Sequence, residues 1–184
     1  MTGLSRFAAG LAVALILAAC SGAPPAPKAL DLGIAAPGAP LPGVNIGSVR
    51  AVAPFDGVDM YYRLAWRNPT ELASFANAVW VAPPAELMRK QLLRASREGF
   101  GKCTLDIEIH EFTQVFGSKE ASEARVELRA WLAARQGRFA SRGWSVDEPS
   151  AGADAGSGAA AFARAADRAI GELGSWLAAQ AECR

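Results

Sequence analysis

The feature that most constrains the fold is a two-residue alternation of apolar and polar side chains near the middle of the chain. Segment 105–109 alternates in this way, and after a turn at 117–120 the segment 124–132 does the same. Because successive side chains of a strand point to opposite faces of a sheet, the pattern predicts two antiparallel strands with one apolar face. A turn at Gln136–Gly137 then leads into a third strand, 139–146.

The segments on either side of this meander predict a mixed α/β pattern. The last helix has an apolar stripe and an opposite charged face, and Asp154, or a residue near it, is placed to cap its start. The expected fold is therefore a single α/β (α+β-like) domain with a mixed, mostly antiparallel sheet and two main helices packed on it. The additional elements are strands at 44–52, 60–66 and 74–81, the first two paired through a turn at 54–57, and helices at 84–97 and 157–181.

The turns also predict the register of the meander. Glu108 then faces Arg129 and His110 faces Glu127, so that opposite charges pair on the outer face. Large aromatic groups on that face must be covered by a helix of this chain or by a partner or second subunit, since Trp and Arg are enriched at such contacts. The residues that this register brings together as a candidate partner surface are Trp131, Arg142 and Trp144.

The N-terminus predicts export and lipidation. An apolar run at 7–19 follows Arg6 and is too short to span a bilayer. It ends in Leu17-Ala18-Ala19-Cys20, which resembles a bacterial lipobox and predicts a signal peptide at 1–19 and acylation of Cys20. An ordinary cleaved signal or an anchor helix is the alternative. By resemblance to enterobacterial sorting signals, Ser21 in place of Asp favours the outer membrane, although the inner membrane stays open.

The residues after the lipobox predict a tether. Segment 20–43 is rich in Pro and Gly and has no periodic apolar pattern. In an extended form, its residues reach at most about 70 Å, which would let a folded domain at 44–184 stand away from the membrane.

Two cysteines remain in the mature chain once Cys20 is acylated. Because the periplasm is oxidising, Cys103 and Cys183 predict a disulfide, which would tie the start of a strand to the end of the last helix. Closing a loop of about eighty residues contributes roughly 4 kcal/mol in the chain-entropy model. The alternative is two separate buried thiols.

Composition and motifs argue against several chemistries. Lys+Arg number 19 and Asp+Glu 18, which gives no basic excess for nucleic acid. One His and three Cys are too few for most zinc sites. Gly156–Ala161 matches G-x-G-x-x-A but follows a loop rather than a strand, so it fails the context of a dinucleotide site. We predict no enzyme, no cofactor and no metal; a hydrolase with an unrecognised Ser or carboxylate pair is a less favoured hypothesis.

Short motifs occur in a fixed order along the chain, at 61–64, 75–80, 82–87, 105–109, 126–132 and 172–176. This ordered series resembles the ABC-type transport auxiliary lipoproteins, the PqiC-like family. The resemblance implies an α/β fold without catalytic residues, anchored on the periplasmic side of the outer membrane. It also implies partnership with an MCE-domain protein and its ABC permease and ATPase, in moving lipids or other hydrophobic molecules between membranes, and some members form homo-oligomeric rings. A lipoprotein chaperone or assembly factor for another outer-membrane complex is the alternative.

Overall fold

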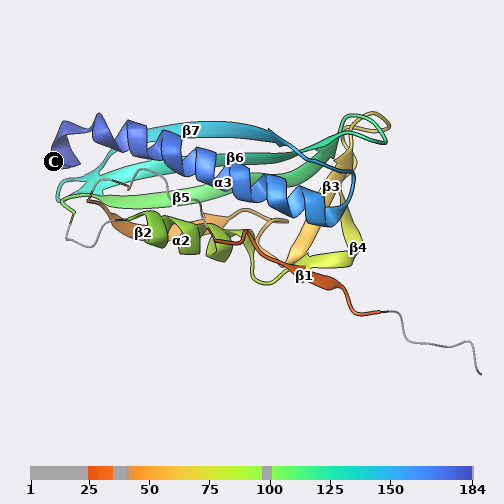
Figure 1. The fold of residues 1–184 in the computed structure, drawn as a ribbon. Helices are drawn as coiled ribbons and strands as arrows, with labels where there is room; N and C mark the ends of the chain where they lie inside the picture. The colour runs from red at the N-terminus through yellow and green to blue at the C-terminus, as the bar shows by residue number, and fades with distance from the viewer. Residues whose placement is uncertain (1–24, 35–40, 42, 97–100, 184) are drawn as a thin grey trace, which may run out of the picture.

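The predicted meander is the centre of the fold. A computed structural model describes residues 25–34, 41, 43–96 and 101–183. Within them one mixed sheet of seven strands has the order β1–β4–β3–β5–β6–β7, with β2 also paired to β5 (Figure 1). The elements are β1 (Lys28–Leu30), β2 (Asn45–Ala51), β3 (Asp59–Leu64), β4 (Ala73–Trp80), α2 (Pro84–Ala95), β5 (Thr104–Phe116), β6 (Ser122–Ala134), β7 (Gly137–Pro149), α3 (Ala155–Ala178) and a 3-10 turn at Ala181–Cys183.

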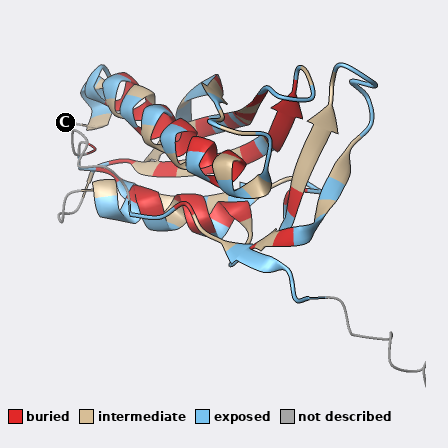
Figure 2. Cartoon of the chain, turned by 45° about the vertical axis from the view of Figure 1, so that its right-hand side comes forward, coloured by how far each residue is buried: buried red, intermediate tan, exposed pale blue. Residues whose placement is uncertain are grey.

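Both helices pack on the same face of the sheet and contact each other (Figures 1 and 2). The apolar side chains that alternate along β5 and β6 point at them and are buried. The other face carries the polar side chains of the same strands, and we call it the open sheet face. The predicted fold class is therefore confirmed, with the long β5–β6 and β6–β7 ladders antiparallel.

An aromatic cluster fixes α3 against the sheet. The ring of Phe162 stacks on that of Phe112, with 4.3 Å between the centroids, and Trp80 meets both rings edge-on. Alanines on the same helix face, among them Ala165 and Ala169, let the helix approach closely because they add little bulk. These large buried side chains belong to β4, β5 and α3, so they connect three distant parts of the chain.

The first two predicted strands do not form a hairpin. β2 and β3 run in the same direction and pair one after the other with the same edge of the long β5, both in parallel. The turn between them therefore shifts the chain along β5 instead of reversing it. Considered locally, a turn between two apolar segments favours a hairpin. Here β5 is long enough to pair with both strands one after the other, so they do not pair with each other.

A bulge in β5 makes the observed register differ from part of the predicted one. The predicted pair Glu108–Arg129 is confirmed, but Glu127 pairs with Glu111, and the prediction that His110 faces Glu127 is wrong. The extra residue, His110, reverses the faces of the side chains that follow it.

The folded domain begins earlier than the predicted Val44. β1 pairs in parallel with β4, Leu32 is buried in the core, and Asp31 Oδ2 lies 2.9 Å from Nζ of Lys90 on α2. Leu41 is also buried, and its N–H donates to Ala95 O at 2.8 Å. These residues therefore belong to the folded domain, although Pro and Gly surround them. Isolated leucines can be buried without any periodic pattern in the sequence. The predicted signal peptide, 1–19, and the predicted lipidation site Cys20 lie outside the described residues.

The predicted disulfide is present in the structure. Cys103 Sγ and Cys183 Sγ are 2.11 Å apart and close a loop with a sequence separation of 80. Cys103 stands just before β5, and Cys183 lies in the 3-10 turn after α3. The bond therefore holds the end of α3 to the start of the central strand.

Replacing Asp154 should remove the cap of α3. Its carboxylate accepts the Ser157 N–H at 3.0 Å, and this backbone hydrogen bond holds the pKa of Asp154 below its ordinary value. We expect Asp154→Ala to lower the free energy of unfolding at neutral pH by about 1 kcal/mol.

The Asn variant and the pH dependence provide the control. Asp154→Asn keeps an acceptor and should be nearly neutral. Because the folded pKa is depressed, the contribution of the carboxylate is complete above its ordinary pKa and disappears as the pH falls through the folded value. Urea unfolding of the three proteins, at neutral pH and well below 3.8, measures both effects. An Asp154→Ala protein as stable as Asp154→Asn at neutral pH would contradict the capping role.

Candidate interaction surface

The three residues of the predicted partner surface do not share a face. Trp131 lies on the open sheet face, where the Arg138 guanidinium stands 5.1 Å from its ring centre. Trp144 pairs with Leu128, and Arg142 with Ala130, so both point to the helix side. The prediction that Trp131, Arg142 and Trp144 lie together is therefore wrong.

The error is a net shift of one residue between β6 and β7. Ala134 pairs with Gly137, so the turn is centred one residue earlier than the predicted Gln136–Gly137. This earlier turn alone would displace β7 by two residues relative to β6. A register shift after Leu132, at Phe139, reverses one of the two. Because side chains alternate with a period of two, this single residue moves Trp144 to the other face.

α3 covers Trp144. The side chain is only 7% exposed, and its ring meets that of Trp176 edge-on at 5.4 Å between centroids. The Arg142 guanidinium lies 5.4 Å from the Trp144 ring centre at the exposed edge of β7. Of the two interpretations of the predicted aromatic surface, cover by the chain's own helix thus holds for Trp144.

The open sheet face is organised by ion pairs across the strands. Arg50 contacts Glu108 at 2.7 Å, and Glu108 also lies 3.2 Å from His110 Nε2. Arg63 contacts Glu111 at 3.2 Å. Further along the sheet are the pairs Arg125–Asp147, Arg125–Glu123 and Arg138–Asp106. Such pairs each contribute little to stability when exposed, so their main effect is to hold a charged surface in one arrangement.

Asp106 shows how tightly this face is arranged. Partial burial would raise the pKa of Asp106, but hydrogen bonds from the N–H and hydroxyl of Ser48, with the Arg138 guanidinium, outweigh it and hold that pKa below its ordinary value. Asp106 thereby stays ionised and connects β2 to β7 across the sheet.

One part of the open sheet face is hollowed. Gly143 on β7 pairs with Arg129 on β6 and has no side chain to fill the space beside it. The hollow measures about 410 Å³ and is lined by His110, Glu127, Arg129, Gly143 and Ser145 together with neighbouring backbone. We call it the Gly143 hollow. A Cβ on Gly143 would meet only the Leu128 carbonyl oxygen, at 3.8 Å, so nothing in the fold requires glycine here.

Arg129 and Glu127 are exposed charged side chains of this hollow. Neither forms an ion pair with another residue in the part of the chain that the structure describes. Trp131 follows Arg129 two residues later on the same face. A glycine inside an otherwise alternating strand is the sequence signal that marks such a site, and the sequence reasoning did not use it.

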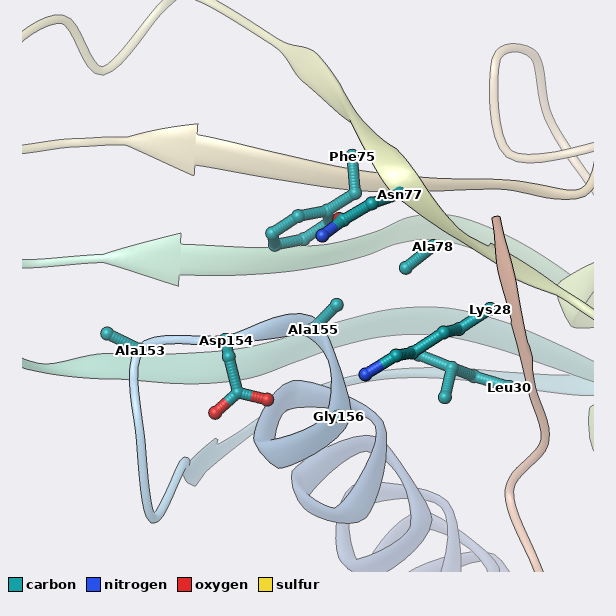
Figure 3. Close-up of a pocket in the computed structure, with 9 residues that line it drawn as sticks. All are labelled: Lys28, Leu30, Phe75, Asn77, Ala78, Ala153, Asp154, Ala155 and Gly156. Carbon is teal, nitrogen blue, oxygen red and sulfur yellow. The ribbon is translucent and has the colours of Figure 1, made fainter. Parts of the chain in front are cut away.

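A second hollow, of about 330 Å³, lies between β1, β4 and the start of α3 (Figure 3). Lys28 and Leu30 reach it from β1, and Phe75 and Asn77 from β4. On the α3 side Asp154 already accepts the Ser157 N–H. Because this cap occupies the helix N-terminus, the hollow has mixed polarity rather than the character of an anion site.

The remaining site predictions concern chemistry and the membrane. In the described ranges no group of three or more His, Cys, Asp or Glu side chains is placed to hold a metal ion. Likewise, none of the described helices is long and apolar enough to cross a membrane. Cys20, the predicted lipidation site, lies outside the described residues.

Two solved structures resemble this domain. XCC0632 from Xanthomonas campestris, described under the family model DUF330, superposes with a TM-score of 0.64 at 24% identity, over 82% of this chain and 91% of that one. The chain shares the fold of XCC0632. A second crystal structure, of an uncharacterised protein, gives a TM-score of 0.63 at 11% identity, over 83% of this chain and 99% of the other. At these identities the likeness concerns the fold alone. No protein-family model and no curated protein matches this chain.

Proposed function

We propose that this chain is a periplasm-facing lipoprotein, anchored through Cys20 to the outer membrane, that serves as a non-catalytic docking component of an MCE-type ABC transporter. Its partner is the MCE-domain protein of a system that moves lipids or other hydrophobic molecules between membranes. The ordered motif series is the observation that carries the proposal, because it occupies contiguous structural elements. The series runs through β3, β4 and the start of α2.

The residues of that series have defined structural roles. Trp80, at the end of β4, is buried between the aromatic rings of β5 and α3. Pro84 opens α2 at a position where a helix tolerates proline. These motifs therefore belong to one packed unit of the domain.

The Gly143 hollow is the docking position we propose on this domain. Arg129 and Glu127 line the hollow, and the partly exposed Trp131 lies on the same face of the same strand. Arg and Trp are the side chains most enriched where binding energy is concentrated. A partner side chain can enter the hollow without any movement of the backbone.

Filling the hollow should weaken partner capture without unfolding the domain. In Gly143→Tyr the new side chain occupies the hollow, and its Cβ meets no atom closer than ordinary contact. We expect the melting temperature to stay equal or rise slightly, because glycine weakens a strand. Affinity for the MCE-domain partner should fall at least about tenfold, equivalent to about 1.4 kcal/mol. The measurement is crosslinking in intact envelopes, followed by affinity capture and mass spectrometry.

Gly171→Ala is the matched control. This glycine lies on the exposed side of α3, with nothing within 4 Å of an added Cβ. It should leave capture unchanged. Equal capture of the MCE-domain protein by Gly143→Tyr would exclude the hollow as the docking position. Enrichment of an outer-membrane assembly complex, with no MCE-domain protein, would reject the transport role in favour of the assembly-factor alternative.

A further inference from the structure

β7 forms one edge of the sheet, and it is long for an edge strand. It has 13 residues, and in the described part of the chain only β6 pairs with it (Figure 1). A long edge presents N–H and C=O groups that can pair with a further extended segment. Natural sheets block these groups with proline, bulges, charged side chains or a covering element, so each part of β7 can be tested for such protection.

The ladder shows which backbone groups of β7 point away from β6. The Ser150 N–H, directly after β7, donates to Ser122 O at 2.8 Å, so Ser150 directs its backbone groups toward β6. In an antiparallel ladder, residues that bond in this way alternate with residues whose N–H and C=O point away. The pairing of the two strands is continuous from Glu123 to Leu132. The residues of β7 with outward backbone groups are therefore Ser141, Gly143, Ser145, Asp147 and Pro149.

The fold blocks both ends of this edge. The Arg168 guanidinium donates to Asp147 O at 3.5 Å, and the Arg164 guanidinium donates to Pro149 O. α3 thus covers the outward carbonyls near the end of β7, and these contacts agree with the alternation because they reach carbonyls that point away from β6. At the start of β7, the register shift at Phe139 interrupts the regular ladder.

Between these two ends, residues 141–145 have no such protection. Ser141, Gly143 and Ser145 are exposed, and no side chain of the described residues bonds their outward N–H or C=O groups. The segment contains neither a proline nor a bulge. We call residues 141–145 the open edge. A short extended segment can pair with it without displacing any contact of the domain.

The Gly143 hollow lies beside the open edge and indicates which side chain fits there. Gly143 pairs with Arg129, so the residue opposite Gly143 on an added strand lies on the same face and leans over the hollow. An aromatic residue suits this position, because a large ring on a neighbouring strand can cover a glycine at a sheet edge. The exposed Arg129 guanidinium can lie against such a ring. Glu127 carries the opposite charge in the same hollow, so an acidic side chain is not favoured there.

Arg142 indicates the charge of the adjacent residue on the partner. It is exposed on the helix side of the open edge, and its guanidinium lies 5.4 Å from the Trp144 ring centre. It forms no ion pair with a carboxylate of the described residues. A carboxylate directly opposite Arg142 on an added strand would pair with it. Two adjacent positions of one extended segment should therefore hold an aromatic and an acidic residue.

A second copy of this chain matches the open edge poorly. Between Gly137 and Ser145, β7 carries Arg138 and Arg142 and no acidic residue. Two copies of this segment side by side would bring the arginines of both together, and no carboxylate of either segment would compensate them. The same charge favours a partner segment that is acidic.

We propose that the open edge binds an extended segment of the partner protein as an additional strand of the sheet. An aromatic side chain of that segment fills the Gly143 hollow, and an acidic residue next to it pairs with Arg142. Main-chain hydrogen bonds then provide affinity, and the two side-chain positions provide specificity. This inference rests on the proposed function in taking the partner to be the MCE-domain protein.

The experiment removes one outward N–H without changing the β6–β7 ladder. In Ser145→Pro the ring replaces an N–H that points away from β6, and proline is tolerated at such positions of an edge strand. Ser145→Ala is the matched control, because it loses the same side chain and keeps the N–H. After crosslinking in intact envelopes, Ser145→Pro should capture at least about fivefold less MCE-domain protein than Ser145→Ala, the effect of one lost hydrogen bond.

Hydrogen exchange of the wild-type chain tests the same contact without any substitution that could affect folding. In the free protein, the outward amides of Ser141, Gly143 and Ser145 should exchange rapidly, and the inward amides of Arg142 and Trp144 slowly. Purified MCE-domain protein should slow the three outward amides. Unchanged exchange of these amides in the complex overturns strand addition.

Reversal of one charge tests the acidic residue of the partner. Arg142→Glu should lower capture by about threefold or more, because like charges then lie opposite each other. Arg142→Lys keeps the charge and should capture like wild type. Equal capture by these two variants overturns the acidic residue opposite Arg142.

The variants separate the mode of docking from the proposed function. Equal capture by Ser145→Pro and Ser145→Ala, with reduced capture by Gly143→Tyr, overturns strand addition and leaves the transport role intact. An assembly complex captured in place of the MCE-domain protein rejects the transport role, and the Ser145 variants then decide strand addition for that complex. A wild type that captures neither overturns both proposals. Light scattering that shows a wild-type dimer and a Ser145→Pro monomer places a second copy on the edge and overturns the partner segment.

Discussion

Trp144→Ala should lower the free energy of unfolding by about 3–5 kcal/mol, as expected for truncation of a buried aromatic side chain. The indole fills the space between β7 and α3 and contacts Trp176 edge-on. Removal leaves a cavity that the sheet and helix cannot close without moving α3, which also carries Phe162 in the central cluster. Urea unfolding followed by circular dichroism measures the change.

Trp131→Ala is the comparison on the other face. That ring is partly exposed and is contacted by Arg138, so its loss should cost about 1 kcal/mol or less. A Trp144→Ala protein that unfolds like wild type would mean that α3 does not cover β7.

Loss of the Cys103–Cys183 disulfide should have a comparable effect, about 4 kcal/mol in the chain-entropy model for a loop of eighty residues. The bond joins the start of β5 to the segment after α3, so without it the unfolded chain gains freedom across nearly half its length. Urea unfolding of protein matured in the periplasm, with and without reductant, gives the difference. Peptide mapping after alkylation without reductant identifies the linked cysteines.

Cys183→Ser provides the control for reductant. This variant should be destabilised from the outset and should not respond further to reduction, whereas wild type should respond fully. Cys103 is completely buried, so changing Cys183, which is partly exposed, avoids placing a hydroxyl in the core. Two freely alkylated thiols in the periplasmic protein would contradict the bond.

Two glycines within strands differ in how they should tolerate substitution. Glycine at 143 is free to change, while Gly47 is not, because a Cβ there would lie 2.5 Å from Asp106 Oδ1 and 2.8 Å from the Thr104 methyl. Both glycines interrupt strands and look alike in the sequence. The atoms on the neighbouring strands distinguish them: there is space for a side chain at Gly143, and none at Gly47.

Local pattern determined much of this fold from the sequence alone. The alternation in 105–109 and 124–132 predicted β5, β6 and their shared apolar face, because side-chain direction in a strand depends only on position. The apolar stripe near the C-terminus predicted α3, and its cap was expected at Asp154 or a residue near it, because capping is a contact within four residues. The structure places the cap at Asp154. The cysteine pair followed from the number of thiols left after acylation.

Tertiary structure alone decided the features that depend on single residues or on distant partners. The bulge at His110 displaces β5 by one residue, and the early β6–β7 turn together with the register shift at Phe139 leaves β7 displaced by one residue. Because side chains alternate with a period of two, the second displacement moves Trp144 to the other face. The parallel pairing of β1 with β4 joins segments about fifty residues apart and has no local signal. Burial of Leu32 follows from that pairing. Composition alone assigns the residues of β1 to a tether, because the strand that pairs with them lies about fifty residues further along the chain.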